Sequence, residues 1–341
     1  TWEKVRKQNY GIDLKMFGAR LSLTADYFFE HRYDILSTRN TLPSIVAIEL
    51  PLINLGEVDN RGYEISLGWN SRAEKIDWWV QGNVSYSKNK IIFMDEVMPN
   101  YPWMAQTGRS TGLNYGYRFD RFLDADGALK TDGEGKPLLP VMSLGSPRPG
   151  DALFKDLNGD GKIDGNDKTY FGYSQRPDYV LGLLGGFRYK NFEISMQWTA
   201  GLHASRMLSG EYRNAFGSTN GRALLKFLAD GRWTPENPDA RFPRLTFLNK
   251  SHYLEDSDLW LMDGSYLRLK VAEIGYTFRD IPAFRKVGVK SLKVYFSGYN
   301  LLTLFSELND IDIDPEGATS GSNIDSYPNV RIFNFGVNIT F

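Results

Sequence analysis

One stretch of the sequence carries oxygen-bearing side chains at a spacing that suits a metal ion. Residues 156–167 read Asp-Leu-Asn-Gly-Asp-Gly-Lys-Ile-Asp-Gly-Asn-Asp. Ca²⁺ takes roughly six to eight oxygen ligands, and a calcium-binding loop of the EF-hand type supplies them from positions 1, 3, 5, 7, 9 and 12, with glycine at position 6. The pattern predicts a bound divalent cation, calcium first. Its expected ligands are Asp156, Asn158, Asp160, Lys162 through its carbonyl oxygen, Asp164 and Asp167, with Gly161 at the turn.

We expect this cation to be structural rather than catalytic. The flanking residues 147–155 and 169–173 do not read as the paired helices of a calcium sensor. Ile163 is expected to plug the loop against its neighbours, and Asp167 replaces the glutamate that is usual at position 12. The shorter aspartate side chain would give one oxygen rather than two. The alternative interpretation is an Asp- and Asn-rich turn that holds no metal.

The other polar residues do not form an arrangement typical of an enzyme. Cysteine is absent, which excludes thiolate chemistry and cysteine-based zinc sites. His31, His203 and His252 do not have the spacing of metal ligands. Neither a Gly-x-Ser-x-Gly nucleophile turn nor a P-loop occurs. The sequence therefore predicts a protein that is not an enzyme and needs no cofactor beyond the structural Ca²⁺.

Composition excludes two further classes of protein. The 40 Lys and Arg residues are balanced by 41 Asp and Glu, so the net charge of −1 does not suit a nucleic-acid binder. No segment approaches about 18 consecutive apolar residues, so no transmembrane helix is expected. The aromatic content is high, with 8 Trp, 19 Tyr and 21 Phe. Such a surplus fits either a binding surface for sugars or peptides, or the aromatic girdle of an outer-membrane barrel.

Apolar and polar residues alternate with a period of two along the whole chain. In the segment 191–199, for example, Phe192, Ile194 and Met196 share one face, whereas Glu193, Ser195 and Gln197 share the other. The phase breaks within 264–279, which predicts a β-bulge near Ala272 and Glu273. Strands are expected at about 8–16, 20–36, 63–69, 76–87, 178–189, 191–199, 264–279, 289–300 and 333–341.

The connections between these strands alternate between short and long. Short ones fall at 17–19, 71–75, 190–191 and 280–288, and long ones at about 37–57, 94–176, 204–262 and 301–329. Transmembrane barrels have short periplasmic turns and long extracellular loops. Residues 112–123 could form another strand, but counting it as a crossing would break this alternation, so we expect β structure inside the long loop. A helix is expected over 220–231, capped by Thr219 or Asn220.

The expected fold is an all-β, antiparallel transmembrane β-barrel wall with long extracellular loops at about 94–176 and 204–262. Single-chain bacterial barrels have an even number of strands. About nine crossings are expected here, so residues 1–341 would form part of a larger barrel. The face of Phe192, Ile194 and Met196 should meet lipid, and the face of Glu193, Ser195 and Gln197 should meet the lumen.

Several segments form a recognisable set, in order along the chain: 155–172, 176–198, 233–238, 258–270, 298–303 and 327–341, and the chain ends on Phe341. Together they resemble the C-terminal part of a SusC/RagA-type TonB-dependent outer-membrane transporter. The resemblance implies a 22-stranded barrel in the outer membrane of a Gram-negative bacterium, energised by the TonB complex. It also implies a SusD-like surface lipoprotein as partner and oligosaccharides or peptides as imported substrate. The plug domain and the TonB-contacting segment would lie upstream, outside this chain.

Four aromatic residues of the long loops are candidates for contacting that substrate: Trp103, Tyr115, Tyr117 and Trp233. They could stack on sugar rings or contact peptide side chains. The alternative function is that of a secreted, calcium-stabilised, β-rich protein that binds carbohydrate. A requirement for detergent would distinguish the barrel from this soluble alternative, because the same apolar faces would be lipid-facing in one and buried in the other.

Overall fold

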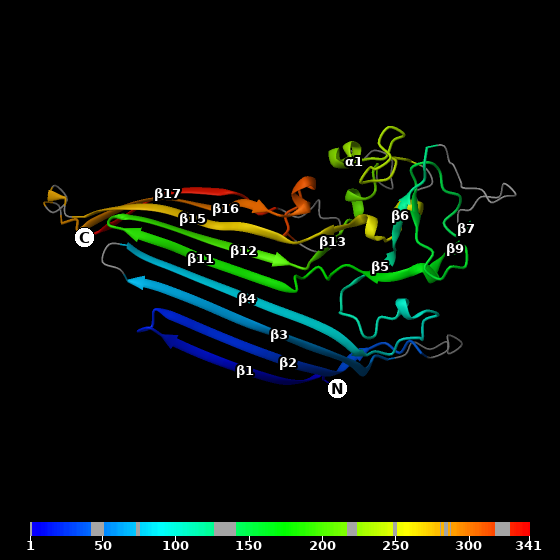
Figure 1. The fold of residues 1–341 in the computed structure, drawn as a ribbon, viewed down its shortest axis with the longest axis horizontal. Coiled ribbons are helices and arrows are strands. Elements are labelled where there is room, and N and C mark those ends of the chain that lie inside the picture. The colour runs from blue at the N-terminus through cyan, green and yellow to red at the C-terminus, as the bar shows by residue number, and fades with distance from the viewer. Residues whose placement is uncertain are drawn as a thin grey trace.

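A computed structural model describes residues 2–41, 51–72, 76–125, 141–216, 224–247, 251–279, 281, 282, 286, 288–317 and 328–341. Nine long strands form one antiparallel sheet in the order β1-β2-β3-β4-β11-β12-β15-β16-β17 (Figure 1). The strands are β1 (Lys4–Met16), β2 (Leu21–Ser37), β3 (Ile53–Arg72), β4 (Ile76–Phe93), β11 (Tyr179–Tyr189), β12 (Phe192–Leu202), β15 (Tyr266–Arg279), β16 (Ser291–Leu304) and β17 (Ile332–Thr340). The predicted antiparallel wall is therefore confirmed, with each expected strand in place.

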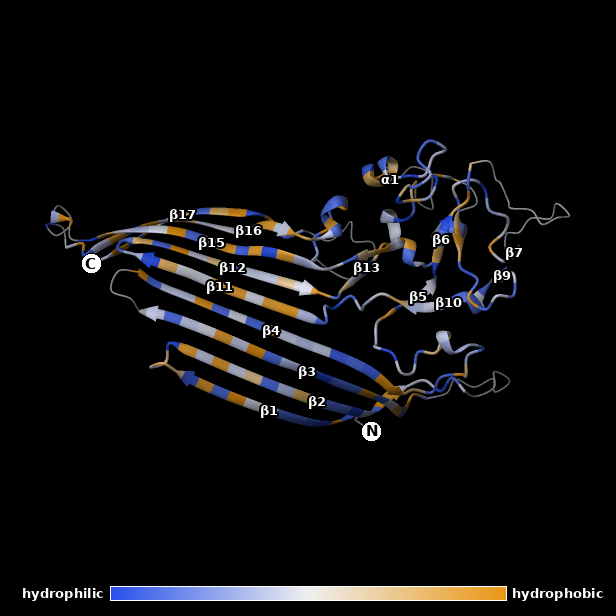
Figure 2. Ribbon diagram, in the orientation of Figure 1, coloured by the Kyte–Doolittle hydropathy of each residue, from blue (hydrophilic) through white to orange (hydrophobic). Residues whose placement is uncertain are grey.

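The two faces of the sheet differ in polarity because side chains alternate along each strand. One register row places Leu14, Leu23, Leu67, Gly82, Leu183 and Trp198 side by side on successive strands. The adjacent row, one residue away, holds Asp13, Thr24, Ser66, Asn83, Gly182 and Thr199. The resulting bands of hydrophobic and hydrophilic residues are visible along the strands in Figure 2. We call the apolar side the outer face and the polar side the inner face.

Side chains on the inner face bind one another across strands. The Thr24 hydroxyl donates to Asp13 at 2.6 Å, Arg188 pairs with Glu193 at 2.9 Å, and Lys293 pairs with Glu273 at 2.9 Å. Ser195 and Gln197 lie on this face with Glu193, and Phe192, Ile194 and Met196 lie on the outer face. Such polar contacts on one side are typical of a barrel wall whose other side meets lipid.

A β-bulge in β15 falls earlier than the sequence suggested. The register with β16 shifts between Leu269 and Val271, not at Ala272 and Glu273. Leu267 and Leu269 therefore point to the outer face before the bulge, and Ala272 continues that face after it. The prediction misplaced the bulge because it assigned Val271 to the outer face, although Val271 lies opposite Gln197 on the inner face.

Short turns and long loops lie at opposite ends of the strands, as predicted. Phe17, Gly18 and Ala19 form the first turn with positive φ angles, and the C-terminus lies at the same end (Figure 1). The N-terminal end of β1 and the long connections lie at the other end. The segment 112–123 forms β5 (Asn114–Tyr117) and β6 (Phe119–Phe122), which pair with β10 (Lys168–Phe171) and β8 (Ala152–Phe154) inside the loop region.

Helical structure is sparse. The predicted helix over 220–231 begins later: α1 spans Lys226–Asp230, with Leu225 as N-cap and Gly231 as C-cap. Thr219 and Asn220, the expected caps, lie outside the described residues. A second helix, α2, spans Ser251–Leu254. Among the residues described above, neither helix has the length and apolarity that a membrane span requires.

The buried core of the molecule lies in the long loops rather than in the wall. Residues of the connections 94–178, 203–265 and 305–331 pack into one hydrophobic cluster, which we call the loop core. Trp260, Leu228 and Leu308 are among its most buried members. Burying a side chain of this size contributes about 1.5–3 kcal/mol, so the loops stabilise one another. The buried members are Tyr117, Phe122, Leu123, Met142, Ala152, Leu153, Phe154, Ile163, Leu208, Ala215, Leu228, Trp233, Phe242, Leu259, Trp260, Met262, Leu308, Ile311 and Ile313.

Candidate functional site

The loop 156–167 is closed by hydrogen bonds from its own backbone to its acidic side chains. Asp156 accepts from the amides of Gly159 at 2.7 Å and Gly161 at 2.8 Å. Asp160 Oδ1 accepts from the Lys162 amide at 2.8 Å. Gly159 and Gly161 have φ angles of 74° and 80°, a region that favours glycine because it has no Cβ. Asp156 and Asp160 therefore hold this segment as a tight turn by accepting hydrogen bonds from its backbone amides.

The end of this loop is fixed to its surroundings. Asp167 is fully buried and accepts from the amides of Leu157 and Asp164, at 2.8 and 2.9 Å. The indole of Trp103 donates to the Asn166 carbonyl at 2.9 Å. Ile163 is fully buried, and its strand β9 (Lys162–Ile163) pairs with β7 (Val141–Met142). The predicted role of Ile163 as a plug is confirmed.

The donor chemistry of the loop fits a hard cation. Four carboxylates, the Asn158 amide oxygen and the Lys162 carbonyl are all oxygen donors, which Ca²⁺ prefers. Each carboxylate oxygen has two lone pairs, so a bond to an amide does not prevent it from binding a metal. In the described part of the chain, no three Asp, Glu or His side chains converge as a metal-ligand group. The prediction of a calcium site therefore depends on the loop turn and its donor set alone.

Two of the four aromatic candidates are buried in the loop core. Tyr117 is 2% exposed and stacks on Phe154 with ring centroids 4.8 Å apart. Trp233 is 6% exposed and covers Gly150, where an added Cβ would lie 2.3 Å from the indole ring. Both rings are therefore almost fully covered by protein. This arrangement argues against direct stacking of Tyr117 or Trp233 on a substrate.

Trp103 and Tyr115 are half-buried and remain candidates for substrate contact. Trp103 stacks on Tyr101 with centroids 4.5 Å apart, and Tyr115 lies 4.7 Å from the ring of Tyr170. Arg109 lies over the other ring of the second pair, 5.2 Å from the Tyr170 centroid. The four rings are set by these contacts rather than free to rotate, which would favour a preformed contact surface.

A buried ionic network was missed by sequence reasoning. Arg268 on β15 is 3% exposed, and its guanidinium donates to Asp314 at 3.0 Å and to Glu316 at 2.6 Å. Lys270 also binds Glu316 at 2.6 Å, and Arg206 donates to the carbonyl of Pro315 at 3.5 Å. The network ties the loop after β16 to the end of the wall. Its only sequence signal is the acidic run 310–316.

Burial in the loop region also shifts the pKa values of two side chains. Desolvation raises the pKa of the Tyr117 phenol to about 12. Desolvation lowers the pKa of the buried His252 imidazole below its ordinary value. In both cases burial disfavours the charged form, so Tyr117 and His252 are neutral near pH 7.

A wall of nine antiparallel strands, apolar outside and polar inside, with loops at one end and tight turns at the other, defines a transmembrane β-barrel segment. Residues 1–301 match the family described as TonB dependent receptor-like, beta-barrel, and the chain belongs to that family.

Individual relatives agree with this assignment. The chain is 30% identical over 366 residues to TonB-dependent receptor P3 of Formosa agariphila, covering 100% of the chain and 34% of that protein. It is 24% identical over 355 residues to TonB-dependent receptor SusC of Bacteroides thetaiotaomicron, covering 100% of the chain and 32% of that protein. The chain thus spans about a third of the length of these relatives, and the expected resemblance to the barrel of SusC-type receptors is confirmed.

A solved structure shows the same fold. The RagAB peptide importer in its open-open state matches with a TM-score of 0.72 and 20% identity, over 100% of this chain and 35% of the compared chain.

Proposed function

We propose that the chain is part of the wall of an active importer in the outer membrane of a Gram-negative bacterium. The observation that carries this proposal is the match of residues 1–301 to the TonB-dependent receptor barrel family. The two faces of the wall support it. The outer face leaves Phe333 59% and Phe335 72% exposed on β17, where a soluble β-sandwich would bury them against a second sheet. The inner face offers charged and amide groups to a hydrated lumen.

Transport by this protein would be driven by the TonB complex through a segment upstream of this chain. Barrels of more than about 20 strands are too wide to be filled by their own side chains and need a plug. The substrate class is oligosaccharides or peptides, and a SusD-like surface lipoprotein is the proposed partner. The names of the relatives support this reading, since one is SusC and another structure is a peptide importer. Trp103 and Tyr115 are the proposed aromatic contacts on the extracellular side.

The loop 156–167 is proposed to bind one structural Ca²⁺. Asp156, Asn158, Asp160, Asp164, Asp167 and the Lys162 carbonyl would hold it. The ion would fix a turn that joins three parts of the loop region, through Ile163, Asp167 and the Trp103–Asn166 hydrogen bond. A loop held at several points keeps its neighbouring aromatic residues in a constant position, which a flexible insertion of more than about 15 residues would not do.

Uptake by the intact protein in its native host tests the function. Cells would receive fluorescent oligosaccharides in one arm and fluorescent peptides in the other, with and without a functional TonB complex. We expect internalised label for one substrate class only, lost without TonB, while label bound at the surface persists. Uptake that continues unchanged without TonB would contradict active import and indicate a passive porin.

A further inference from the structure

Five tyrosines form one register row on the outer face. Tyr10, Tyr27, Tyr63, Tyr86 and Tyr179 lie opposite one another on β1, β2, β3, β4 and β11. The rings of Tyr63 and Tyr86 are 5.4 Å apart, and those of Tyr86 and Tyr179 are 4.6 Å apart. Tyrosine gathers where hydrocarbon gives way to lipid headgroups. The row therefore marks the extracellular edge of the lipid-facing band.

Cationic side chains follow directly beyond this edge. Arg61 and Lys88 are paired across β3 and β4, each two residues past its tyrosine and on the same outer face. Lys90 comes next on that face, and all three side chains are exposed. Among the described residues, Arg61 and Lys90 have no carboxylate within 4.0 Å, whereas Lys88 lies 3.7 Å from Asp178. We call Arg61, Lys88 and Lys90 the outer cationic patch.

The outer cationic patch lines a pocket of about 490 Å³, and residues 108–110 form part of its wall. β11 begins at Tyr179, opposite Tyr86 of β4. Beyond this point residues 108–110, rather than β11, lie alongside β4. The Gly108 amide donates to the Ile91 carbonyl and the Ile91 amide to the Arg109 carbonyl, both at 2.8 Å. Two carboxylates also line the pocket: Asp59, which pairs with His31 at 2.7 Å, and Asp178.

The fourth cation of the pocket, Arg109, is already occupied. Its guanidinium donates to the carbonyls of Ala105 and Trp103, at 2.8 and 3.0 Å. The positive charge available to a ligand is therefore that of the outer cationic patch, which faces outward at the level of the lipid headgroups.

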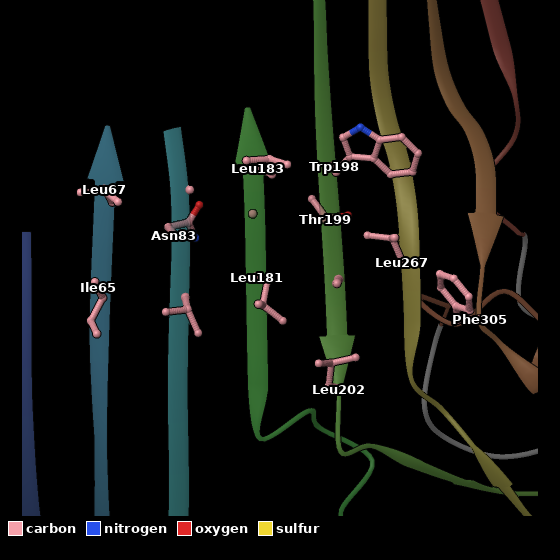
Figure 3. Close-up of a pocket in the computed structure, with 14 residues that line it drawn as sticks. Ile65, Leu67, Asn83, Leu181, Leu183, Trp198, Thr199, Leu202, Leu267 and Phe305 are labelled. Carbon is pink, nitrogen blue, oxygen red and sulfur yellow. The ribbon is translucent and has the colours of Figure 1, made fainter. Parts of the chain in front are cut away.

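An apolar groove of about 770 Å³ lies on the side of the tyrosine row away from the patch. Figure 3 shows residues that line this groove. Its floor is low because Gly82 and Ala200 occupy outer-face positions on β4 and β12. The groove is flanked by Ile65 and Leu67 on one side and by Trp198 on the other, with Leu267 and Phe305 beyond. Arg61 and Leu67 lie on the same face of one strand, so the patch and the groove are separated by about 20 Å or less.

We propose that this surface binds a phosphorylated lipid of the outer leaflet. The phosphate would pair with Arg61, Lys88 and Lys90, and an acyl chain would lie in the groove over Gly82. A soluble anion would use only the patch, whereas an amphiphile uses the patch, the tyrosine row and the groove together. The combination assigns the site to a lipid such as lipid A rather than to free phosphate. This inference rests on the proposed outer-membrane location, but its test measures lipid binding, not transport.

The test uses the intact, delipidated protein in detergent, titrated with diphosphorylated lipid A and followed by native mass spectrometry. Arg61→Ala/Lys88→Ala should weaken binding roughly 30-fold, since each basic residue near an anionic lipid surface contributes about a factor of five. The matched control Lys7→Ala/Lys15→Ala removes two cations from the inner face of β1 and should bind as the wild type does. The swap Arg61→Lys/Lys88→Arg should retain binding and shows that loss does not reflect misfolding.

Two further arms identify the ligand. Dephosphorylated lipid A should bind weakly, and inorganic phosphate should not displace the lipid. Gly82→Leu, which fills the groove while leaving the patch intact, should also weaken binding. The proposal is overturned if Arg61→Ala/Lys88→Ala binds as well as the control Lys7→Ala/Lys15→Ala, or if phosphate-free lipid A binds as well as the phosphorylated form. It is also overturned if inorganic phosphate competes or if Gly82→Leu has no effect.

Discussion

Arginine substitutions at two adjacent positions of β12 test which face of the wall meets lipid. Met196 is the fifth of the eleven residues of β12 and lies on the outer face, opposite Gly185 and Ala272. Gln197 is its neighbour on the inner face. The same new charge is thus placed at nearly the same depth but on opposite sides of the sheet.

The expected penalty follows from the position of Met196 near the middle of the strand. Arginine on the lipid face of a barrel costs about 2–4 kcal/mol at the bilayer midplane and less near the interfaces. Gly185 and Ala272 leave room for the arginine to bend towards the headgroups, which favours the lower half of that range. Met196→Arg should therefore lower the folding equilibrium constant by roughly 30-fold or more. Gln197→Arg should change the folding free energy by less than about 0.5 kcal/mol.

The assay is a guanidinium titration of the intact protein folded into lipid vesicles, followed by the loss of heat-resistant migration on gels. The fraction of each variant assembled in the outer membrane of cells provides a second readout. Equal destabilisation by the two arginines would refute the assignment of faces, and so would an unaffected Met196→Arg. A larger penalty for Gln197→Arg would show that the faces are reversed.

Three other predictions concern the loop region. Calcium should raise the protease resistance of the 94–178 loop in the wild type, and a chelator should remove that effect. Asp160→Ala should abolish the effect of calcium while the wall keeps its heat-resistant migration. A wild-type loop whose protease resistance does not respond to calcium would contradict the calcium site. Because the folded-state pKa of His252 is depressed below 6.5, its contribution to loop stability is full above that pH and is lost as the pH falls below it. Limited proteolysis should show loosening near pH 5 that His252→Leu lacks. Arg268→Ala should weaken docking of the loop by about 3–5 kcal/mol, because it leaves Asp314 buried and unpaired. The control Arg188→Ala removes an exposed ion pair and should cost about 1 kcal/mol or less. Equal hydrogen exchange of residues 305–317 in the two variants would contradict a docking role for Arg268.

The wall was predictable from sequence because its signal is local and repeated. Alternation over ten or more residues identifies a strand, and the order of short and long connections orients it. Boundaries were less accurate where alternation weakens. β3 begins at Ile53 rather than near residue 63. The prediction missed the first part of this strand because a register shift between Glu57 and Val58 interrupts the alternation there. The bulge lies at Lys270 rather than at Ala272 and Glu273. It was misplaced because Val271 is apolar but faces inward, so the alternation gives a false phase at that point.

The loop core was not predictable, because it depends on contacts between segments far apart in the sequence. Trp260, Leu228 and Leu308 come from different parts of the chain and meet only after the strands have placed their loops together. For that reason Tyr117 and Trp233 looked available for substrate. The outer cationic patch did have a signal, since Arg61 lies two residues before Tyr63 and Lys88 two residues after Tyr86, each in phase with its tyrosine. Recognising it required the register that pairs the two strands.

The most direct test of the barrel account is the accessibility of the two ends of the strands in living cells. The chain contains no cysteine, so single cysteines can be introduced and compared with the unsubstituted protein. Met98, in the long loop that follows β4, is 91% exposed, and Ala19 lies at the tip of the first short turn. In the intact protein, Met98→Cys should react with a membrane-impermeant maleimide on whole cells, and Ala19→Cys only after the outer membrane is permeabilised. Labelling of Ala19→Cys on intact cells, with Met98→Cys protected, would contradict the orientation, and labelling of both would contradict a wall that crosses the membrane.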